Sequence, residues 1–527
     1  MLIVLYLRDI LGELMKNSYK IVLGAGFAVA AAFYANSLVG LANNGSFLML
    51  AALFGAYMAM NIGANDVANN VGPAVGAGAL SIGGAILVAS IFELSGALIA
   101  GGDVVGTIKK GIIDPTAFGS DPMVFVYAMS AALLSAALWL NLATWLKAPV
   151  STTHSIVGGV MGAGIAAGGF AVVSWAMMGK IAASWVISPV MGGVIAAVFL
   201  YIIKSQILYR ENKLDAAKKI VPFLVALMTA AFVAYITLKG LKKVWPLLVE
   251  ALPFLPESKE PTFSVAASLG VIGGIISYFT VKMRIVKKVV GMENVREDIN
   301  RLFTIPLIFA AALLSFAHGA NDVANAIGPL AAVNDALSKA MVSTEASIPL
   351  WVMIVGGLGI SIGLALFGPR LIKTVGSEIT ELDQVRAFSI MMAASLTVVL
   401  ASQLGLPVSS THIAVGAVFG VGFLREWLDS QEMKEKQQAL YVEVEKLREL
   451  KADLKACPGN DYKKQVELSS KVKAQKSKVK KIKKVLREDY VKRGLVKKIV
   501  TAWIITVPAA AVLSAIIFYA LQGATIA

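Results

Sequence analysis

The eleven residues GANDVANNVGP at positions 63–73 decide the fold, because nine of them recur in GANDVANAIGP at positions 319–329. A second pair of motifs follows in the same order, PVSTTH at 149–154 and PVSSTH at 407–412. The copies are 256 and 258 positions apart, so the register between them is almost unchanged. Two polar matches in the same order within an apolar chain indicate an internal duplication.

The composition around these motifs is that of a membrane protein. The chain has 527 residues, of which 57% are hydrophobic and 15% charged, with a mean hydropathy of +0.73. A soluble domain carries about 25% charged residues, and a disordered chain has low hydrophobicity. We therefore predict an all-α polytopic membrane protein. The single cysteine, Cys457, excludes an internal disulfide framework.

Apolar runs long enough to cross a bilayer predict about 12–13 spans. The runs at 47–62 and 303–318 are short and continue into the repeated polar motif, which predicts broken helices. The runs at 150–170 and 405–424 are expected to be separate spans. Seven crossings separate the two broken helices in this count, and an odd number turns the second copy upside down. The sequence thus predicts an inverted-topology repeat transporter.

Positive charge is concentrated near the C-terminus. Of the net charge of +15, residues 425–498 contribute +10, from 22 basic and 12 acidic residues. We interpret this segment as a solvated cytoplasmic insert near anionic lipid, and not as a nucleic-acid-binding region. Apolar residues at three- and four-residue steps on both sides of a turn at 457–460 predict an antiparallel helical hairpin. Its role is either that of a spacer or that of a regulatory, partner-binding element.

The basic clusters also set the orientation. An even number of expected spans separates the clusters at 204–219, 282–301 and 425–498, so they share one side, which the positive-inside rule makes cytoplasmic. The N-terminus lies with them and the C-terminus lies outside. The expected organisation is an N-terminal segment and first span (1–45), a first repeat (46–203), connecting spans and basic loops (204–301), a second, inverted repeat (302–424), the cytoplasmic hairpin (425–498) and a last span (499–527).

Asp66 and Asp322 are the first candidates for a functional site. They lie where apolar runs meet glycine-rich breaks, and a charge at the bilayer centre costs about 2.5–3.5 kcal/mol on insertion scales. Carboxylates beside asparagine side chains offer the oxygen ligands that hard cations prefer. We therefore predict sodium coordination by Asp66, Asn69, Asp322 and Asn325. The alternative is that the aspartates cap helices or bond the other repeat.

The hydroxyl triplets after Pro149 and Pro407 predict an anion site. Proline is tolerated in the first helical turn, and serine and threonine cap helix starts. A helix N-terminus inside the membrane presents free N–H groups and a positive dipole to an anion. Simple helix capping is the alternative. The candidate substrate-binding residues are Asn65, Ser151, Thr152, Thr153, Asn321, Ser409, Ser410 and Thr411.

Four further polar residues are candidates for coupling or for orienting the site. All three histidines of the chain, His154, His318 and His412, fall in or beside the repeated motifs. Glu93 lies within an apolar run, where a carboxylate is a functional candidate. The alternatives are packed histidines and a lipid-facing or interfacial glutamate. The sequence has no phosphate-binding G-x-x-x-x-G-K-[ST] motif and no Cys/His metal cluster. Transport energy would then come from an ion gradient or from downhill flow.

The paired G-A-N-D-V-A-N and P-V-S-[ST]-T-H motifs resemble those of the inorganic phosphate transporter (PiT) family, over roughly 45–200 and 300–424. The resemblance implies sodium- or proton-coupled phosphate symport through an inverted-repeat fold, often as a dimer. It also implies that Asp66 and Asp322 form the ion site, with transport roles for Ser151, Ser409 and Glu93. Two features differ from the family pattern: Met391 stands where many members carry a second glutamate, and the insert at 425–498 is unusual.

The expected function is import of inorganic phosphate with sodium as co-substrate, by alternating access, in the plasma (cytoplasmic) membrane. No cofactor, enzymatic activity or nucleic-acid partner is expected, and a homodimer is. Several alternatives stay open: proton coupling, transport of sulfate or another oxyanion, an anion channel, and a membrane-embedded hydrolase using the two aspartates.

Overall fold

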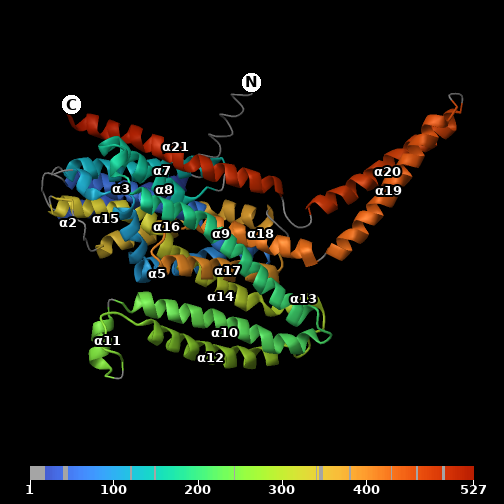
Figure 1. Ribbon diagram of the computed structural model, residues 1–527, viewed down its shortest axis with the longest axis horizontal. Helices are drawn as coiled ribbons and strands as arrows, with labels where there is room; N and C mark the ends of the chain where they lie inside the picture. The colour runs from blue at the N-terminus through green and yellow to red at the C-terminus, as the bar shows by residue number, and fades with distance from the viewer. Residues whose placement is uncertain are drawn as a thin grey trace.

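The computed structural model describes residues 18–39, 45–118, 122–146, 150–242, 244–253, 255–339, 341–342, 348–378, 382–428, 430–458, 461–488 and 493–526. Within these ranges the elements are helices, and the strand-like pairing consists of one isolated bridge between Ile113 and Val173. Eleven of the described helices are long and apolar enough to cross a membrane. The predicted all-α membrane fold is confirmed (Figure 1).

Each copy of the eleven-residue motif interrupts a long helix. Helix α3 (Gly45–Asn65) continues into α4 (Val67–Gly76) through Asp66. Helix α14 (Thr304–Asp322) continues into α15 (Ala324–Lys339) in the same way. The prediction of broken helices at these two places is confirmed. Both breaks lie in the interior of the molecule, so the polar motif residues face protein and not lipid.

Helices of one copy pack against helices of the other copy. Helix α5 (Ile82–Ala100) runs along α14, and α16 (Leu350–Glu378) runs along α3. Glycine permits this close approach, because a Cβ on Gly319 would overlap the carbonyl oxygen of Glu93. A Cβ on Gly63 would overlap the carbonyl oxygen of Ile360 in the equivalent contact. Small residues at helix crossings are the usual means of bringing backbones together in membranes.

Two helix pairs form hairpins. In the first pair, the start of α7 (Pro122–Trp145) lies near the end of α8 (Thr152–Gly168). The segment before α7 connects these two ends, because Phe118 packs on Phe125 of α7 and Ile113 forms the isolated bridge with Val173, just after α8. Helices α17 (Gln384–Gln403) and α18 (Ser410–Leu428) form the second pair.

The hairpins account for the number of spans. The runs expected as spans at 150–170 and 405–424 are the second arms, α8 and α18, which are not among the eleven long apolar helices. The described residues therefore contain eleven candidate spans, against an expected 12–13. The physical reason is that the Ser/Thr/His motif begins each second arm and shortens its apolar stretch. Because α8 was one of the crossings counted between the two broken helices, that count does not hold, and the inverted topology stays a prediction.

The second arms are also packed through glycines. Gly158 and Gly162 of α8 meet the backbone of α21, and Gly416 and Gly420 of α18 meet the backbone of α9. This matched packing agrees with the duplication seen in the sequence. The other long helices are α2 (Ser18–Val39), α9 (Trp175–Ile203), α10 (Lys213–Gly240), α12 (Phe263–Lys288) and α21 (Arg493–Ile526).

The basic insert forms the predicted hairpin, from α19 (Ser430–Ala456) and α20 (Tyr462–Glu488). Gln475 Nε2 donates to the carbonyl oxygen of Glu443 at 2.9 Å across it, and Val479 is buried in the seam. In Figure 1 the hairpin projects from the end of the molecule at which α13 (Arg296–Leu302) lies. The basic clusters are thus at one end, as the orientation argument requires.

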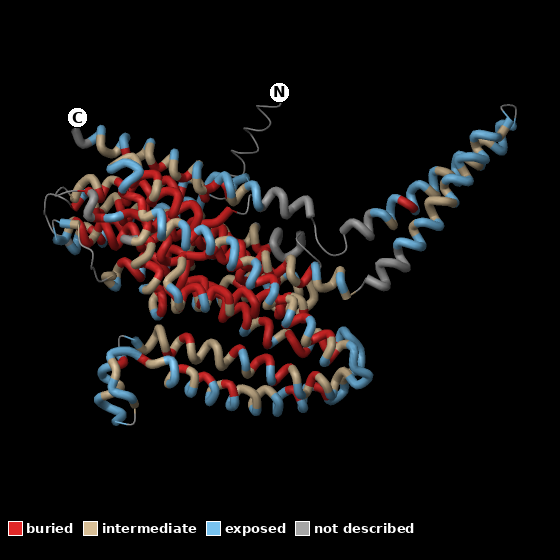
Figure 2. The backbone as a smooth tube through the Cα atoms, viewed as in Figure 1, coloured by how far each residue is buried: buried red, intermediate tan, exposed pale blue. Residues whose placement is uncertain are grey.

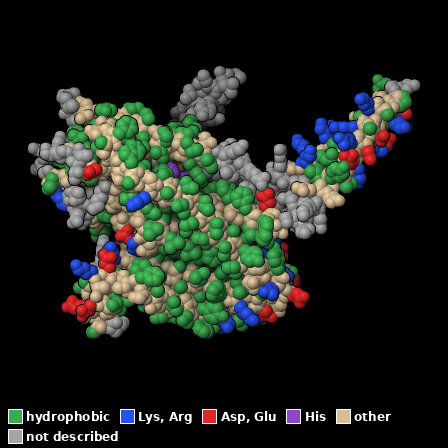
Figure 3. Space-filling model, viewed as in Figure 1, with side chains coloured by type: hydrophobic (Ala, Val, Ile, Leu, Met, Phe, Trp, Pro, Cys, Tyr) green, Lys and Arg blue, Asp and Glu red, His purple; other side chains and the backbone are tan. Residues whose placement is uncertain are grey.

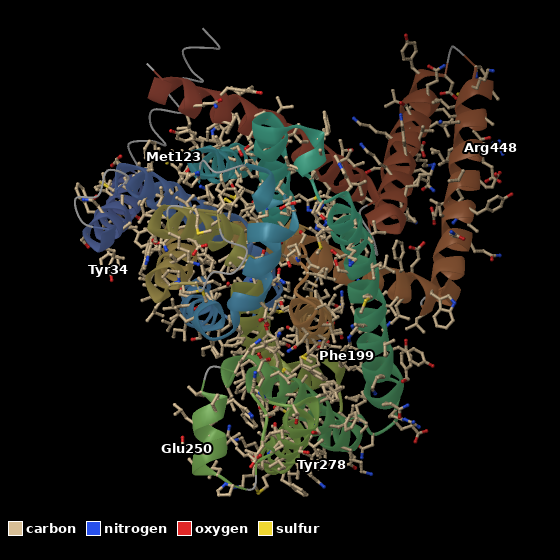
Figure 4. All side chains as sticks on the ribbon, turned by 60° about the vertical axis from the view of Figure 1, so that its left-hand side comes forward. Tyr34, Met123, Phe199, Glu250, Tyr278 and Arg448 are labelled. Carbon is tan, nitrogen blue, oxygen red and sulfur yellow. The ribbon has the colours of Figure 1, made fainter. Side chains whose placement is uncertain are left out.

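The figures distinguish three parts of the molecule: the helical body, the basic hairpin and the pair of helices α10 and α12. Figure 2 shows buried residues concentrated in the helical body, while the hairpin is largely exposed. Figure 3 shows hydrophobic side chains over the body and Lys and Arg side chains along the hairpin. In Figure 4, Arg448 marks the hairpin and Tyr278 marks α12, whose pair with α10 flanks the body. The expected N-terminal segment lies outside the described residues up to position 17.

Candidate functional site

Both hydroxyl motifs begin a helix in the interior. Ser151 precedes α8, and its Oγ accepts from the backbone N–H of His154 at 3.1 Å. Ser409 precedes α18, and its Oγ accepts from the backbone N–H of His412 at 3.3 Å. The capping alternative therefore holds for the two serines. Pro149 lies outside the described residues, and the remaining hydroxyls of the motifs have other partners.

The two aspartates lie together and share a hydroxyl. Thr152 Oγ1 is 2.6 Å from Asp66 Oδ2 and 3.3 Å from Asp322 Oδ2. Ser410 Oγ, the counterpart of Thr152 in the second copy, is 3.5 Å from Asp322 Oδ2. Both aspartates are almost fully buried, with 1% and 0% of their surface exposed. Two buried carboxylates this close need positive charge beside them, which a bound cation or the His318 imidazole, 3.1 Å from Asp322 Oδ2, can supply.

Asparagines connect each copy of the first motif to the second motif of the other copy. Asn69 Nδ2 donates to Thr411 Oγ1 at 2.8 Å, and Asn325 Nδ2 donates to Thr153 Oγ1 at 3.2 Å. Thr411 Oγ1 in turn donates to Asp66 Oδ1 at 3.1 Å. The four motifs therefore form a single polar site, as their spacing predicts.

The remaining two asparagines are held by backbone carbonyls. Asn65 Nδ2 donates to the Val150 carbonyl at 2.9 Å, and Asn321 Nδ2 donates to that of Leu406 at 3.2 Å. Four buried oxygens of these side chains and of Asp322 and Asn325 have no hydrogen-bond partner among the described residues. They are Asn65 Oδ1, Asn321 Oδ1, Asn325 Oδ1 and Asp322 Oδ1. Buried oxygens without donors are suited to bind a hard cation.

Glu93 is inside the protein, so the lipid-facing alternative is wrong. Its side chain is 0% exposed, with Oε2 2.8 Å from His318 Nδ1 and Oε1 accepting from Asn70 Nδ2 at 2.8 Å. His318 Nε2 lies 3.1 Å from Asp322 Oδ2. Glu93 and His318 therefore adjoin the aspartates, and their coupling or orienting role stays a prediction.

His154 and His412 lie in a different environment. Their rings are 4.5 Å apart, and each stacks on a tryptophan, Trp185 at 3.6 Å and Trp503 at 3.4 Å between ring centroids. Among the described residues, neither of these imidazoles forms an ion pair or hydrogen bond with a carboxylate. The packed-histidine alternative describes this pair better than a role in the ion site.

Several site residues were missed in the sequence. Asn70 bonds Glu93, and Ser402 Oγ accepts from Asn321 Nδ2 at 3.0 Å. A signal for Asn70 was present, because it is one of two positions at which the eleven-residue motifs differ. Ser402 and the stacking tryptophans carry no such signal. Met391, at the expected place of a second glutamate, is buried on α17.

Comparison with known proteins shows the family to which the chain belongs. Residues 62–514 match the model of the phosphate transporter family. The chain belongs to this family. A "Putative phosphate permease" of Helicobacter pylori is 49% identical over 528 residues, covering 97% of this chain and 96% of the relative. A like-named protein of Pyrococcus abyssi is 39% identical over 378 residues, covering 72% and 89%.

A solved structure extends the comparison to three dimensions. It bears the description "The sodium-dependent phosphate transporter" and matches with a TM-score of 0.72 and 32% identity, covering 90% of this chain and 99% of that one. Membership of the phosphate transporter family indicates a multi-pass membrane transporter and not an enzyme. The polar site at the two helix breaks thus lies within the fold of a phosphate transporter.

Proposed function

We propose that the protein imports inorganic phosphate across the plasma membrane together with sodium. The observation that carries the proposal is the pair Asp66 and Asp322, one from each copy, joined through Thr152 Oγ1 at 2.6 and 3.3 Å. The pair lies beside two helix starts rich in hydroxyl groups. Carboxylates for a cation and helix N-termini for an anion are the two halves of a symport site.

Electrostatics favours coupling to cations. Moving one charge across 100 mV is worth about 2.3 kcal/mol, so a phosphate of charge −2 entering alone would cost about 4.6 kcal/mol. Two accompanying sodium ions cancel this cost, and a third makes the membrane potential helpful. Sodium bound at the aspartates would also reduce their repulsion of the anion.

The site suggests an order of binding. Sodium binds first, at Asp66, Asn69, Asp322 and Asn325, because without it two carboxylates and the unpartnered amide oxygen of Asn325 are buried. Phosphate then binds between the starts of α8 and α18. Its donors are the hydroxyls of Ser151, Thr152, Thr153, Ser409, Ser410 and Thr411, with Asn65 and Asn321 nearby.

Alternating access follows from the duplication. The crosswise contacts of α5 with α14 and of α16 with α3 support two halves related by an inverted repeat. Such halves rock about a fixed midplane site in secondary transporters. The homodimer expected from the family resemblance stays a prediction.

The test is uptake of labelled phosphate into proteoliposomes with an inward sodium gradient. Accumulation should require sodium, and Asp66→Asn and Asp322→Asn should each abolish it while the purified protein keeps its monodispersity. Ser470→Ala, on the exposed hairpin, is the matched control. Uptake like that of the wild type in either aspartate variant would remove the ion-site assignment.

The same assay separates the alternatives. Uptake that ignores sodium but follows a proton gradient would indicate proton coupling, and competition by sulfate would widen the substrate class. Flux without uphill accumulation would indicate a channel. Turnover of a phosphate ester without transport would indicate a hydrolase.

A further inference from the structure

One half of the site contains a polar chain that the other half lacks. Asn70 Nδ2 donates to Glu93 Oε1 at 2.8 Å, and Glu93 Oε2 lies 2.8 Å from His318 Nδ1. Glu93 and His318 are both 0% exposed. Burying a carboxylate costs free energy unless the surrounding groups pair with it or donate hydrogen bonds to it.

The equivalent positions in the other half are apolar. Gly319 packs against the carbonyl of Glu93 as Gly63 packs against that of Ile360, so Ile360 is the counterpart of Glu93. The motif register likewise makes Ile62 the counterpart of His318, and Ala326 that of Asn70. Because two isoleucines and an alanine satisfy the same packing, the Asn70–Glu93–His318 chain is not needed for the fold alone.

The hydrogen-bonded series Asn70–Glu93–His318 leads to the two aspartates. Glu93 Oε2 is placed to accept from Nδ1–H of His318, and in that neutral tautomer Nε2 carries the lone pair that a metal ion can take. This nitrogen lies 3.1 Å from Asp322 Oδ2 without a hydrogen bond of regular geometry. One ligand atom from each of Asp66, His318 and Asp322 lies within 4.8 Å of the others. Asp322 Oδ1 also has no partner among the described residues.

We propose that Asp66, His318 and Asp322 bind a divalent transition-metal ion of the zinc class. Sodium and other hard cations prefer oxygen ligands, whereas zinc accepts imidazole nitrogen together with carboxylate oxygen. Ligands about 2.0–2.2 Å from a tetrahedral ion stand roughly 3.3–3.6 Å apart. The 3.1 Å between His318 and Asp322 is close to this spacing.

Glu93 then acts as a positioning residue. A metal-binding histidine usually donates its other N–H to a carboxylate, which fixes the tautomer and the ring orientation. Asn70 in turn fixes Glu93. A bound divalent ion would occupy both aspartates assigned above to sodium and would block sodium-coupled uptake. The inhibition rests on the proposed function, but the metal binding does not.

The binding test uses the full chain, purified in detergent and in phosphate-free buffer. Calorimetry with Zn²⁺ and visible absorption with Co²⁺ should both report one site per chain. His318→Gln should abolish it, and Glu93→Gln should weaken it about 10–100-fold. His412→Gln, a buried histidine without a carboxylate neighbour, and Cys457→Ser, which removes the only thiol, should bind like the wild type.

A measurement on the unaltered protein guards against variants that fail to fold. X-ray absorption of the zinc-loaded wild type should show one imidazole among oxygen ligands. An oxygen-only shell, no stoichiometric zinc binding, or full binding in a folded His318→Gln variant would overturn the proposal. Zinc binding with this signature would support it even if proteoliposomes showed no sodium-dependent uptake, a result that would count against the proposed function alone.

Discussion

Asn69 and Thr411 are 342 positions apart in the chain, yet Asn69 Nδ2 donates to Thr411 Oγ1 at 2.8 Å. The contact joins the first motif of one copy to the second motif of the other. The hydrogen-bond network extends through Thr411 to Asp66, because the Thr411 hydroxyl donates to Asp66 Oδ1 at 3.1 Å. The polar site around Asp66 is therefore built across the interface between the two copies, and neither copy contains it whole.

This contact predicts coupled energetics between the two copies. Asn69→Ala and Thr411→Val should each lower the thermal stability of the purified protein, and the double variant should lose less than the sum of the two. Residues in one hydrogen-bond network show interaction energies of about 0.5–3 kcal/mol. Thermal unfolding of the four proteins measures the difference. Additive losses would mean that the side chains act independently, as we expect for Asn69→Ala combined with the distant Ser470→Ala.

Thr152 should control sodium affinity more than phosphate affinity. Its hydroxyl lies within hydrogen-bond distance of both Asp66 Oδ2 and Asp322 Oδ2, at 2.6 and 3.3 Å. A hydrogen bond to a charged group is worth about 1.5–3 kcal/mol, which is roughly a 10–150-fold change in affinity. Thr152→Ala should therefore raise the sodium concentration needed for half-maximal uptake by about that factor.

Thr152→Ser is the matched control for this measurement, because it keeps the hydroxyl and removes a methyl group. It should stay within a few-fold of the wild type. An equal loss in both variants would attribute the effect to packing and not to the hydrogen bond.

Gly319 should tolerate no side chain. A Cβ there would overlap the carbonyl oxygen of Glu93, where α14 meets α5. Overpacking of this kind typically costs about 1–3 kcal/mol, and here it would also move Glu93 away from His318. Gly319→Ala should lower the melting temperature and uptake together. Gly26→Ala, on the exposed face of α2 with open space around it, should leave both unchanged.

The repeated motifs explain how much could be predicted from sequence. Asp66, Asp322 and the hydroxyl triplets were identified because each occurs twice in matching places, and duplication marks polar residues that a membrane would otherwise exclude. The hairpin pairing of α7 with α8 and of α17 with α18 could not be read in this way. An apolar run has the same hydropathy whether it crosses the bilayer or turns back inside the protein.

The partners of individual side chains were also beyond the sequence. His154, His318 and His412 look alike beside their motifs, but only three-dimensional packing puts His318 beside Glu93 and stacks the other two on tryptophans. Asn70 became interpretable only once Glu93 was seen to accept its hydrogen bond. A difference between two copies is informative when the structure shows what fills the position.

Acid should release a contact at the start of α17. Asp383 precedes α17 and pairs with Arg386 at 3.1 Å and Arg296 at 2.9 Å. Burial alone would raise the pKa of Asp383, but the two arginines and the backbone N–H of Arg386 hold it below the usual value. The folded protein thus binds this proton more weakly than the unfolded chain does. The stabilisation is complete above about pH 4 and disappears as the pH falls through the lowered pKa.

Melting temperatures measured from pH 7 down to pH 3 check this prediction. Asp383→Asn should be less stable than the wild type at pH 7, and the gap should narrow toward pH 3. Asp453→Asn, on the hairpin helix α19, should show no comparable gap at either pH. A gap that widens in acid would contradict the sign of the linkage.

The basic hairpin should be dispensable for transport. Helices α19 and α20 pack on each other, with Gln475 and Lys478 both hydrogen-bonded to Glu443. Among the residues that the structure describes, neither helix forms a hydrogen bond or ion pair with the site. Replacing 433–487 by a short Gly/Ser linker should therefore leave sodium-dependent uptake in proteoliposomes within about two-fold of the wild type. The same replacement in cells tests the other role of the hairpin. Uptake lost in cells but kept in proteoliposomes would indicate that a cellular partner acts through the hairpin, whereas loss in both would contradict the spacer prediction itself.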